Sequence, residues 1–221
     1  MIVLAAKKGG DVRFCIDFRK LNDVTKKDSF PLPRIDDSLS KLGGSKWFST
    51  MDLASGYWQV EMDEQDKEKT AFVVEDGLYQ FKVLPFGLCN AGATFQRLMQ
   101  LALAGLSWEM VLVYIDDLIV HSRTFEEHLG HLKQVFDKLS AAGLKMSPKK
   151  CDFSRREVVF LGHIVSERGV ETDPSKTAAV AEWPKPTRLK EVQAFLGLCG
   201  YYRRFIRGFS AIAQPLYCLS Q

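Results

Sequence analysis

Two apolar runs separated by a pair of aspartates constrain the fold of this chain more than any other feature of its sequence. The runs are residues 110–114 and 118–120, and between them stand Ile115, Asp116 and Asp117. β-Branched and aliphatic residues favour strands, and so short an interruption favours a tight turn. We therefore predict a β-hairpin here, with apolar strands and two carboxylates at its tip.

The aspartate pair is a candidate site for divalent cations. Carboxylates beside a core are costly unless a cation or donor compensates them, and two adjacent carboxylates repel each other. Magnesium prefers oxygen ligands, so two Mg²⁺ ions, or Mn²⁺ in their place, would suit this site. Asp52 ends a predicted strand and would add a third carboxylate if the two strands are neighbours. The competing interpretation is an ordinary turn, because aspartates tolerate turn backbone angles.

The composition argues for an intracellular globular protein. Its 221 residues are 46% hydrophobic, enough for one substantial core with or without a small satellite lobe. No run of about eighteen apolar residues predicts a membrane span, and the start of the chain lacks the ordered regions of a signal peptide. The five cysteines are odd in number and form no Cys-x-x-Cys pair, so we expect reduced thiols in core positions.

Charge is unevenly distributed along the chain. Residues 1–34 hold 8 basic and 4 acidic side chains, residues 35–148 hold 10 and 16, and residues 149–221 hold 12 and 7. Basic ends could grip a phosphate backbone while acids in the middle hold cations. On charge alone, ordinary surface variation explains the pattern equally well.

Strand and helix patterns are interspersed without regular alternation, which favours an α+β fold over a doubly wound parallel sheet. Besides the hairpin, we predict strands over residues 12–18, 46–53, 78–83 and 158–165, and helices over residues 35–42, 93–103, 125–142 and 189–205. In the helix after the hairpin, Leu129, Leu132, Val135, Phe136 and Leu139 fall on one apolar stripe. His128 and His131 lie three residues apart there, but no third metal ligand is evident, so we expect them at the surface.

Four short motifs, in this order, resemble the successive motifs of reverse transcriptases. They are Phe-Ser-Thr-Met-Asp-Leu at 48–53, Leu-Pro-Phe-Gly-Leu-Cys-Asn-Ala at 84–91, Tyr-Ile-Asp-Asp at 114–117 and Phe-Leu-Gly-His at 160–163. The residues of these motifs most resemble those of the gypsy class of long-terminal-repeat retrotransposons. The gypsy-class resemblance extends to three further segments, residues 93–97, 195–197 and 201–205. The resemblance covers nearly the whole chain, and several ordered motifs are more specific than any one alone.

The resemblance implies an α+β right-hand polymerase whose palm has an antiparallel sheet backed by helices. It divides the chain into partial fingers at 1–45, a palm at 46–165 with an inserted fingers part near 60–85, and a partial thumb at 166–221. The implied activity is RNA-directed DNA synthesis by a two-metal mechanism. Implied partners are an RNA or DNA template with its primer, and deoxynucleoside triphosphates. The implied location is a cytoplasmic particle or the nucleus.

The same resemblance assigns metal binding to Asp52, Asp116 and Asp117, with help from the Leu53 carbonyl. Tyr57 matches the steric gate, a ring that crowds a 2′ hydroxyl and selects deoxynucleotides. The alternative for Tyr57 is a core tyrosine beside Trp58.

Further nucleotide-binding positions are implied at Lys7, Arg13, Phe86, Gly87 and Lys150. Lysine suits a triphosphate as a mobile point charge and arginine as a planar fork. The match of this segment to the family is open by one residue, so Lys8 could take the place of Lys7. Apart from the resemblance, Lys7 and Arg13 would be ordinary surface charges. Phe86 departs from the glutamine common in vertebrate retroviruses, so we expect it to pack by the nucleotide. Lys150, with Lys149, resembles lysines that assist the leaving group; a surface role is the alternative.

The remaining implied positions touch the template and primer. Phe160, Leu161, Gly162 and His163 resemble the primer grip, which positions the primer 3′ end. Asp17 and Arg19 resemble a segment near the template, or form a structural ion pair. The thumb positions are Gln193, Gly197 and Tyr201, four residues apart on one helix face, followed by the phosphate-contacting arginines Arg203, Arg204 and Arg207. Tyr201 could instead be a core residue.

Two other functions stay open on the sequence. One is a truncated, inactive remnant that binds nucleic acid, because the family normally has more fingers before this chain, and more thumb, a connection and an RNase H domain after it. RNase H cleavage has no support in this sequence. The other is an RNA-dependent RNA polymerase, against which Tyr57 argues, because a ribonucleotide needs room for its 2′ hydroxyl.

Overall fold

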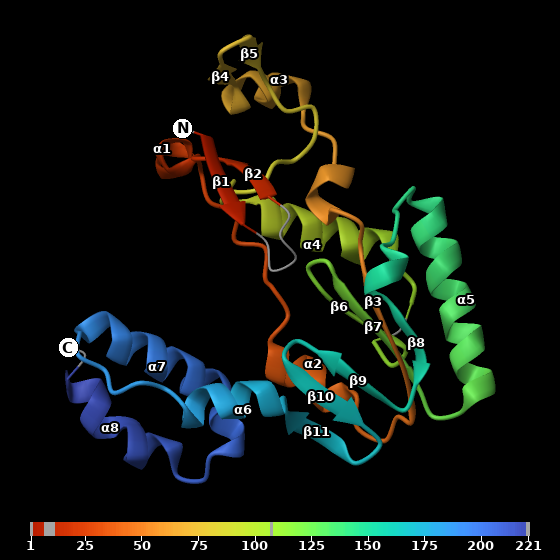
Figure 1. Ribbon diagram of the computed structural model, residues 1–221. Coiled ribbons are helices and arrows are strands. Elements are labelled where there is room, and N and C mark those ends of the chain that lie inside the picture. Colours follow the sequence, from red (N-terminus) through yellow and green to blue (C-terminus); the bar gives the residue numbers. More distant parts are fainter. Residues whose placement is uncertain (1, 7–11, 107, 220–221) are drawn as a thin grey trace.

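The computed structural model describes residues 2–6, 12–106 and 108–219, arranged in three lobes (Figure 1). The upper lobe contains β1 (Ile2–Ala6), β2 (Val12–Ile16), α1 (Arg19–Val24), α3 (Glu64–Lys67), η2 (Glu68–Thr70), β4 (Phe72–Val74) and β5 (Gly77–Tyr79). The central lobe holds α2 (Ile35–Lys41), β3 (Trp47–Asp52), η1 (Gly56–Gln59), α4 (Ala91–Ala102), β6 (Val111–Tyr114), β7 (Asp117–Ser122), α5 (Phe125–Ala141), η3 (Pro148–Lys150) and β8 to β11. The helical lobe holds α6 (Pro174–Ala181), α7 (Leu189–Tyr201), η4 (Arg203–Phe205) and α8 (Phe209–Leu219).

The central lobe is built on a four-stranded antiparallel sheet in the order β6-β7-β3-β8, where β8 is Asp152–Arg155. Successive side chains of a strand point to opposite faces, and both faces of this sheet are covered. Leu118 and Val120 of β7 face α4 and α5, in one core cluster with Phe95. Ile119 faces the other way, into a second cluster with Leu39 of α2. A strand buried on both faces reads as a continuous apolar run, which is why the hairpin was legible in the sequence.

A second sheet of three antiparallel strands packs against the second core cluster. It consists of β9 (Glu157–Phe160), β10 (His163–Ser166) and β11 (Gly169–Thr172). Phe160 pairs with His163 across a two-residue turn, Leu161 and Gly162. Val158 and Phe160 of β9 are buried in the cluster with Phe48 of β3. This hairpin therefore lies directly against the central sheet.

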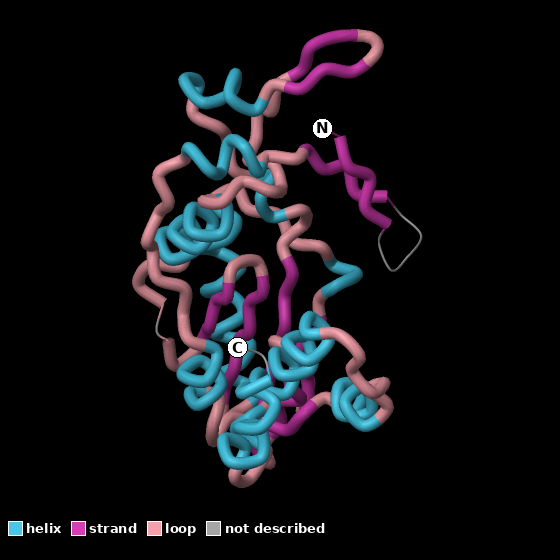
Figure 2. Tube along the Cα trace, turned by 90° about the vertical axis from the view of Figure 1, so that its left-hand side faces the viewer, coloured by secondary structure: helices cyan, strands magenta, loops and turns pink. Residues whose placement is uncertain are grey.

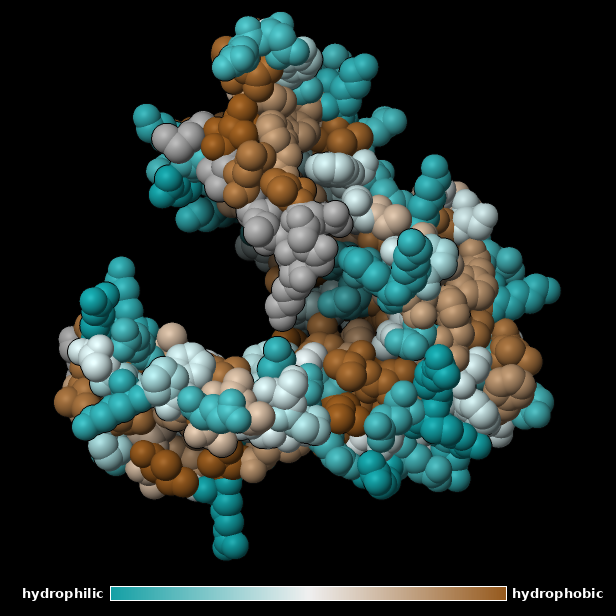
Figure 3. Space-filling view, viewed as in Figure 1, coloured by the Kyte–Doolittle hydropathy of each residue, from teal (hydrophilic) through white to brown (hydrophobic). Residues whose placement is uncertain are grey.

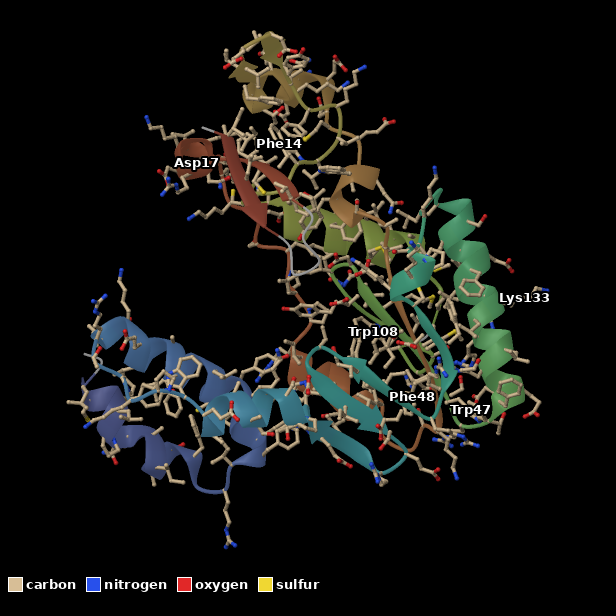
Figure 4. All side chains as sticks on the ribbon, in the orientation of Figure 1. Phe14, Asp17, Trp47, Phe48, Trp108 and Lys133 are labelled. Carbon is tan, nitrogen blue, oxygen red and sulfur yellow. The ribbon has the colours of Figure 1, made fainter. Side chains whose placement is uncertain are left out.

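The upper lobe has little core of its own. Its two hairpins, β1–β2 and β4–β5, contact each other through the rings of Phe14 and Phe72, which lie 5.5 Å apart. The ring of Phe72 also lies 5.5 Å from that of Phe81, which follows β5. In two perpendicular views the β4–β5 hairpin stands at the top of this lobe (Figure 1 and Figure 2). Figure 4 shows Phe14 and Asp17 in this lobe, away from Phe48 in the central lobe.

Most predicted elements are confirmed, including the hairpin, its carboxylate tip and the helix that follows it. The strand predicted over residues 78–83 is wrong beyond residue 79, because β5 ends at Tyr79. The helix predicted over residues 189–205 ends at Tyr201 and continues as the 3₁₀ turn η4. Leu129 lies outside the apolar stripe at 50% exposure, and Cys89 and Cys218 are exposed rather than core thiols. Among the described residues, no helix is long and apolar enough to span a membrane.

His128 overturns the expectation that both helix histidines lie at the surface. Its side chain is fully buried at 0% exposure, between α5 and the central sheet. Nε2 lies 2.7 Å from the Ser49 hydroxyl of β3, and Nδ1 lies 2.9 Å from the Ser122 hydroxyl of β7. The Ser49 hydroxyl also accepts the backbone N–H of Ser154. The imidazole is buried because two serines satisfy it, and it joins α5 to the sheet.

Stability of the fold should depend on pH through His128. Burial, with repulsion from His131 and His121, lowers the pKa of His128 from 6.5 to about 4. Between about pH 6.5 and pH 4, His128 is protonated in the unfolded chain but neutral in the folded chain. Its contribution to the unfolding free energy is therefore fully present above pH 6.5 and is lost as the pH falls towards 4. We expect a loss of about 2 kcal/mol in unfolding free energy between about pH 7.5 and pH 5 from this group. Denaturant titrations at both pH values measure it.

The matched variant is His128→Asn, which keeps a polar side chain but removes the titration. His121 and His163 also have pKa values lowered by burial, so the variant should keep part of the pH dependence. Equal slopes of unfolding free energy against pH in the two proteins would contradict this role of His128.

Candidate active site at the ends of the central strands

The three aspartates singled out in the sequence come to one end of the central sheet. In the antiparallel ladder between β3 and β7, Asp52 stands directly opposite Asp117. Tyr114 of β6 pairs with Asp117 on its other side, so the connecting turn consists of Ile115 and Asp116 alone. Strand pairing thus places on neighbouring strands carboxylates that are 65 residues apart in the chain.

The electrostatics of this end are dominated by like charge. Loss of hydration, followed by repulsion from Asp116 and Asp52, raises the pKa of Asp117 to about 6, although the residue stands at an exposed strand end. The positive charge of Lys150, on η3 just before β8, lowers this pKa and so opposes the shift. Its Nζ lies 3.2 Å from both carboxylate oxygens of Asp52. The site therefore attracts cations, and a flexible ammonium group already contacts one of its carboxylates.

The turn that carries Asp116 has a demanding backbone. Ile115 adopts a φ of 56°, a left-handed conformation that is unfavourable for a β-branched residue. The Gln96 side chain on α4 holds it: Oε1 accepts the Ile115 N–H at 2.7 Å, and Nε2 donates to the Val113 carbonyl at 3.4 Å. Gln96 is 0% exposed. Sequence reasoning missed it, although a glutamine on the buried face of a predicted helix was a usable signal.

Aromatic packing places Tyr57 beside the turn. The Tyr57 ring lies 5.5 Å from Phe86 and 5.5 Å from Phe95, and burial and the Asp116 charge raise its pKa. Gly56 makes this approach possible, because a Cβ there would lie 2.9 Å from the Phe95 ring and 3.3 Å from Cβ of Asp116. Gly56 is a second residue that the sequence did not reveal. Tyr57 itself is half-buried.

Gly87 joins this region to the upper lobe. Its φ of 99° suits glycine, and its carbonyl accepts a hydrogen bond from the Asn22 amide at 2.8 Å. A Cβ at this position would lie 3.4 Å from the Ile16 carbonyl. Gly87 therefore permits the close contact between strand β2 and the loop that carries Phe86.

A small cavity of about 190 Å³ connects the aspartates to the second sheet. Its lining includes Asp52, Asp117 and Lys150 together with Phe160 and Leu161. Two of the predicted metal residues, Asp52 and Asp117, and part of the predicted primer grip thus share a cavity. A larger cavity of about 670 Å³ lies between α1, the 60–70 segment and the start of α4, and none of the predicted site residues line it.

The other predicted positions lie further out. Asp17 and Arg19 form an ion pair, in which Nη2 of Arg19 lies 2.7 Å from Oδ2 of Asp17. This is the structural ion pair that the sequence analysis gave as an alternative, and it lowers the pKa of Asp17. Lys7 lies outside the described residues, as does the side chain of Arg13. On α7, Gln193, Gly197 and Tyr201 are exposed along one face. The Arg204 guanidinium lies 3.6 Å from Asp36 of α2.

The donor set fits divalent metal ions, judged by its chemistry. All three candidate ligands are carboxylates, and their mutual repulsion adds to the loss of hydration that raises the pKa of Asp117. Among the described residues, no three His, Cys, Asp or Glu side chains form a ready metal cage. Magnesium is usually held by one or two carboxylates together with water and substrate phosphates, so a partial protein cage is what it needs.

Comparison with known proteins gives a consistent result. The family model described as "Reverse transcriptase (RNA-dependent DNA polymerase)" matches residues 5–165. The chain is 48% identical, over 92% of its length, to the Pol polyprotein from transposon 297 of Drosophila melanogaster, and 43% identical, over 95%, to that from transposon gypsy of the same organism. These matches cover 19% and 21% of the relatives, so the chain spans about a fifth of their length. The predicted gypsy-class resemblance is confirmed.

Two solved structures confirm the α+β fold. One is a foamy viral protease-reverse transcriptase in complex with double-stranded DNA, with a TM-score of 0.91, 31% identity, and coverage of 99% of this chain and 38% of that one. The other is a foamy viral protease-reverse transcriptase in complex with an RNA/DNA hybrid, with a TM-score of 0.87, 30% identity, and coverage of 99% and 29%.

The Gln96 contact can be tested by stability. Gln96→Leu keeps the size of the buried side chain but removes the acceptor for the Ile115 N–H. Leaving that N–H unpaired should lower the unfolding free energy by about 1–3 kcal/mol. Gln100→Leu, on the exposed side of the same helix, is the matched control and should change it by less than about 0.5 kcal/mol. Equal effects of the two substitutions in denaturant titrations would refute the contact.

Proposed function

This chain belongs to the reverse transcriptase family, and we propose that it is the polymerase part of a retrotransposon Pol polyprotein. It would extend a primer 3′ end with deoxynucleotides copied from an RNA or DNA template. The observation that carries the proposal is the pairing of Asp52 with Asp117, with Asp116 in the adjoining turn. A purified chain that extends a primed homopolymer template would support it. Binding of the template without extension would favour an inactive remnant.

The proposed fingers, palm and thumb correspond largely to the three lobes, but their bounds place α2 of the central lobe with the fingers and β11 with the thumb. The upper lobe and residues 1–45 would be fingers, residues 46–165 the palm with its inserted fingers part near 60–85, and residues 166–221 part of the thumb. Figure 3 shows the molecule hollowed between the upper and helical lobes. A template-primer duplex would lie in this hollow, with the basic ends of the chain near its phosphates.

Asp52, Asp116 and Asp117 would hold two Mg²⁺ ions, or Mn²⁺, with the Leu53 carbonyl as a further oxygen. When bound, such ions activate a primer hydroxyl and stabilise a leaving pyrophosphate. The Lys150 ammonium is exposed on its outer side and contacts Asp52, so it can swing towards the triphosphate as its charge arrives. Lys7 and Arg13 would clamp the same triphosphate from the fingers.

Tyr57 would select the sugar. Its ring packs against Phe86 and Phe95, and it lies close enough to Asp116 for that negative charge to raise its pKa. A ring held there would collide with a ribonucleotide 2′ hydroxyl. This distinguishes a DNA polymerase from an RNA-dependent RNA polymerase with related palm architecture. Because the relatives are retrotransposon polyproteins, we also propose an intracellular site of action, in a cytoplasmic particle or the nucleus.

Asp116→Asn is the direct test of the carboxylates. The substitution removes one negative charge from the turn and almost no volume, so the fold should be unchanged. Primer extension should fall by at least about a hundredfold, because fixed charge and positioning supply most of this chemistry. The control is Asp137→Asn on the exposed face of α5. Extension by Asp116→Asn at the rate of the unsubstituted chain would sink the proposal.

Tyr57 is tested by comparing two substitutions. Tyr57→Ala removes the ring and should raise incorporation of ribonucleotides relative to deoxynucleotides by about ten- to a hundredfold. Tyr57→Phe keeps the ring and should keep the selectivity of the unsubstituted chain. Single-nucleotide incorporation with matched ribo- and deoxynucleoside triphosphates measures the ratio. A chain that already prefers ribonucleotides before substitution would instead point to an RNA polymerase.

A further inference from the structure

The turn between β9 and β10 is a backbone conformation that needs support. Leu161 and Gly162 have φ values of 47° and 70°, so both central residues of this two-residue turn are left-handed. Such turns fit the twist of a hairpin but favour Asn or Gly at the first position, and leucine there is unfavourable. Leu161 also lines the cavity of Asp52 and Asp117. The shape of this turn therefore sets one wall of the candidate active site.

Two consecutive tyrosines at the end of α7 hold the turn from the helical lobe. The Tyr201 hydroxyl donates to the Leu161 carbonyl at 2.7 Å, and the Tyr202 hydroxyl donates to the Gly162 carbonyl at 2.9 Å. The partners are 40 residues apart in the chain. Each carbonyl of the turn is thus bound by a hydroxyl from the same end of the same helix.

The buried ring of His163 packs against the residues that make this contact. It is 1% exposed, and the rings of Tyr201, Tyr202 and Phe205 lie 5.4, 5.3 and 5.7 Å from its own. Its Nδ1 lies 2.8 Å from the Leu161 carbonyl and must carry the proton, because a carbonyl only accepts.

Gly162 fits closely under the helix. A Cβ at this position would lie 3.0 Å from the Tyr202 hydroxyl oxygen, so a larger residue would press on that hydroxyl and also strain the backbone angle. The salt bridge from Arg204 to Asp36 is half-exposed and adds little to this attachment. The hydroxyls and the aromatic rings are therefore the main link between the helical lobe and the turn.

We propose that Tyr201 and Tyr202 are positioning residues that couple α7 to the Leu161–Gly162 turn. When a duplex displaces α7, the turn moves with the helix, and so does the wall of the cavity that would receive the primer end. This inference rests on the proposed polymerase function for its consequence, but the coupling itself is a property of the free chain. In this proposal the Tyr201 hydroxyl supports the turn within the protein, whether or not the Tyr201 ring also contacts nucleic acid.

The test removes the hydroxyls and keeps the rings, with Tyr201→Phe, Tyr202→Phe and the double substitution. In the free chain, hydrogen exchange should become about 3- to 10-fold faster both in residues 158–166 and in residues 193–205. Tyr202→Phe should have the larger effect, because Leu161 keeps its bond from His163. With a primed template, KM for the template-primer should rise about 3- to 10-fold while KM for the deoxynucleotide is unchanged.

Tyr79→Phe is the matched control, since the Tyr79 hydroxyl bonds Asp76 within the upper hairpin, and it should change neither readout. Exchange that quickens in only one of the two segments, or a lower melting temperature with unaltered KM for template-primer, would overturn the coupling. A chain that extends no primer before substitution would refute the proposed function instead. The exchange measurement would still decide whether α7 and the turn are coupled.

Discussion

The antiparallel pairing of β3 with β7 is the constraint on which the rest of the structure depends. It sets Asp52 opposite Asp117 and so gathers negative charge at one end of the sheet. A slip of one residue would turn every side chain of β7 to the other face and exchange the contents of two core clusters. The cores on both sides thus fix the register, and the register fixes the carboxylates. Apolar packing therefore stabilises an arrangement of like charges that would otherwise repel.

Around that sheet, two turns with unfavourable backbone angles are each held from a helix. Gln96 of α4 fixes the Ile115–Asp116 turn, and two tyrosine hydroxyls at the end of α7 fix the Leu161–Gly162 turn. Strained turns persist when the surrounding structure determines them. Leu161 of one turn lines the cavity, and the other turn immediately precedes Asp117, which lines it too. Side chains outside the three aspartates therefore help to set the shape of this region.

Much of this could be read from the sequence, and the rest could not for identifiable reasons. The hairpin was legible because its apolar residues are shared between core clusters on the two faces of the sheet. The strand that ends at Asp52 was also predicted, although Ser49 and Thr50 stand between its buried Phe48 and Met51. His128 was misplaced because a histidine becomes a core residue only when Ser49 and Ser122 satisfy it, and sequence spacing does not show such partners. Gln96 and Tyr202 act on carbonyl and amide groups distant in the chain. Strand β5 ends at Tyr79, and Phe81 beyond it packs against the rings of Phe18 and Phe72, so the apolar pattern there reflects ring packing and not strand pairing.

A strand buried on both faces also affects how the protein can diverge. Each residue of β7 from Leu118 to Val120 serves one core or the other, so no position in this stretch is free to vary in volume without disturbing α4 and α5 on one side or α2 and β9 on the other. The exposed β4–β5 hairpin, with Val73 and Leu78 each 72% exposed, has no such obligation. Sequence change should therefore accumulate at the edges of the molecule, leaving its centre the slowest part to drift.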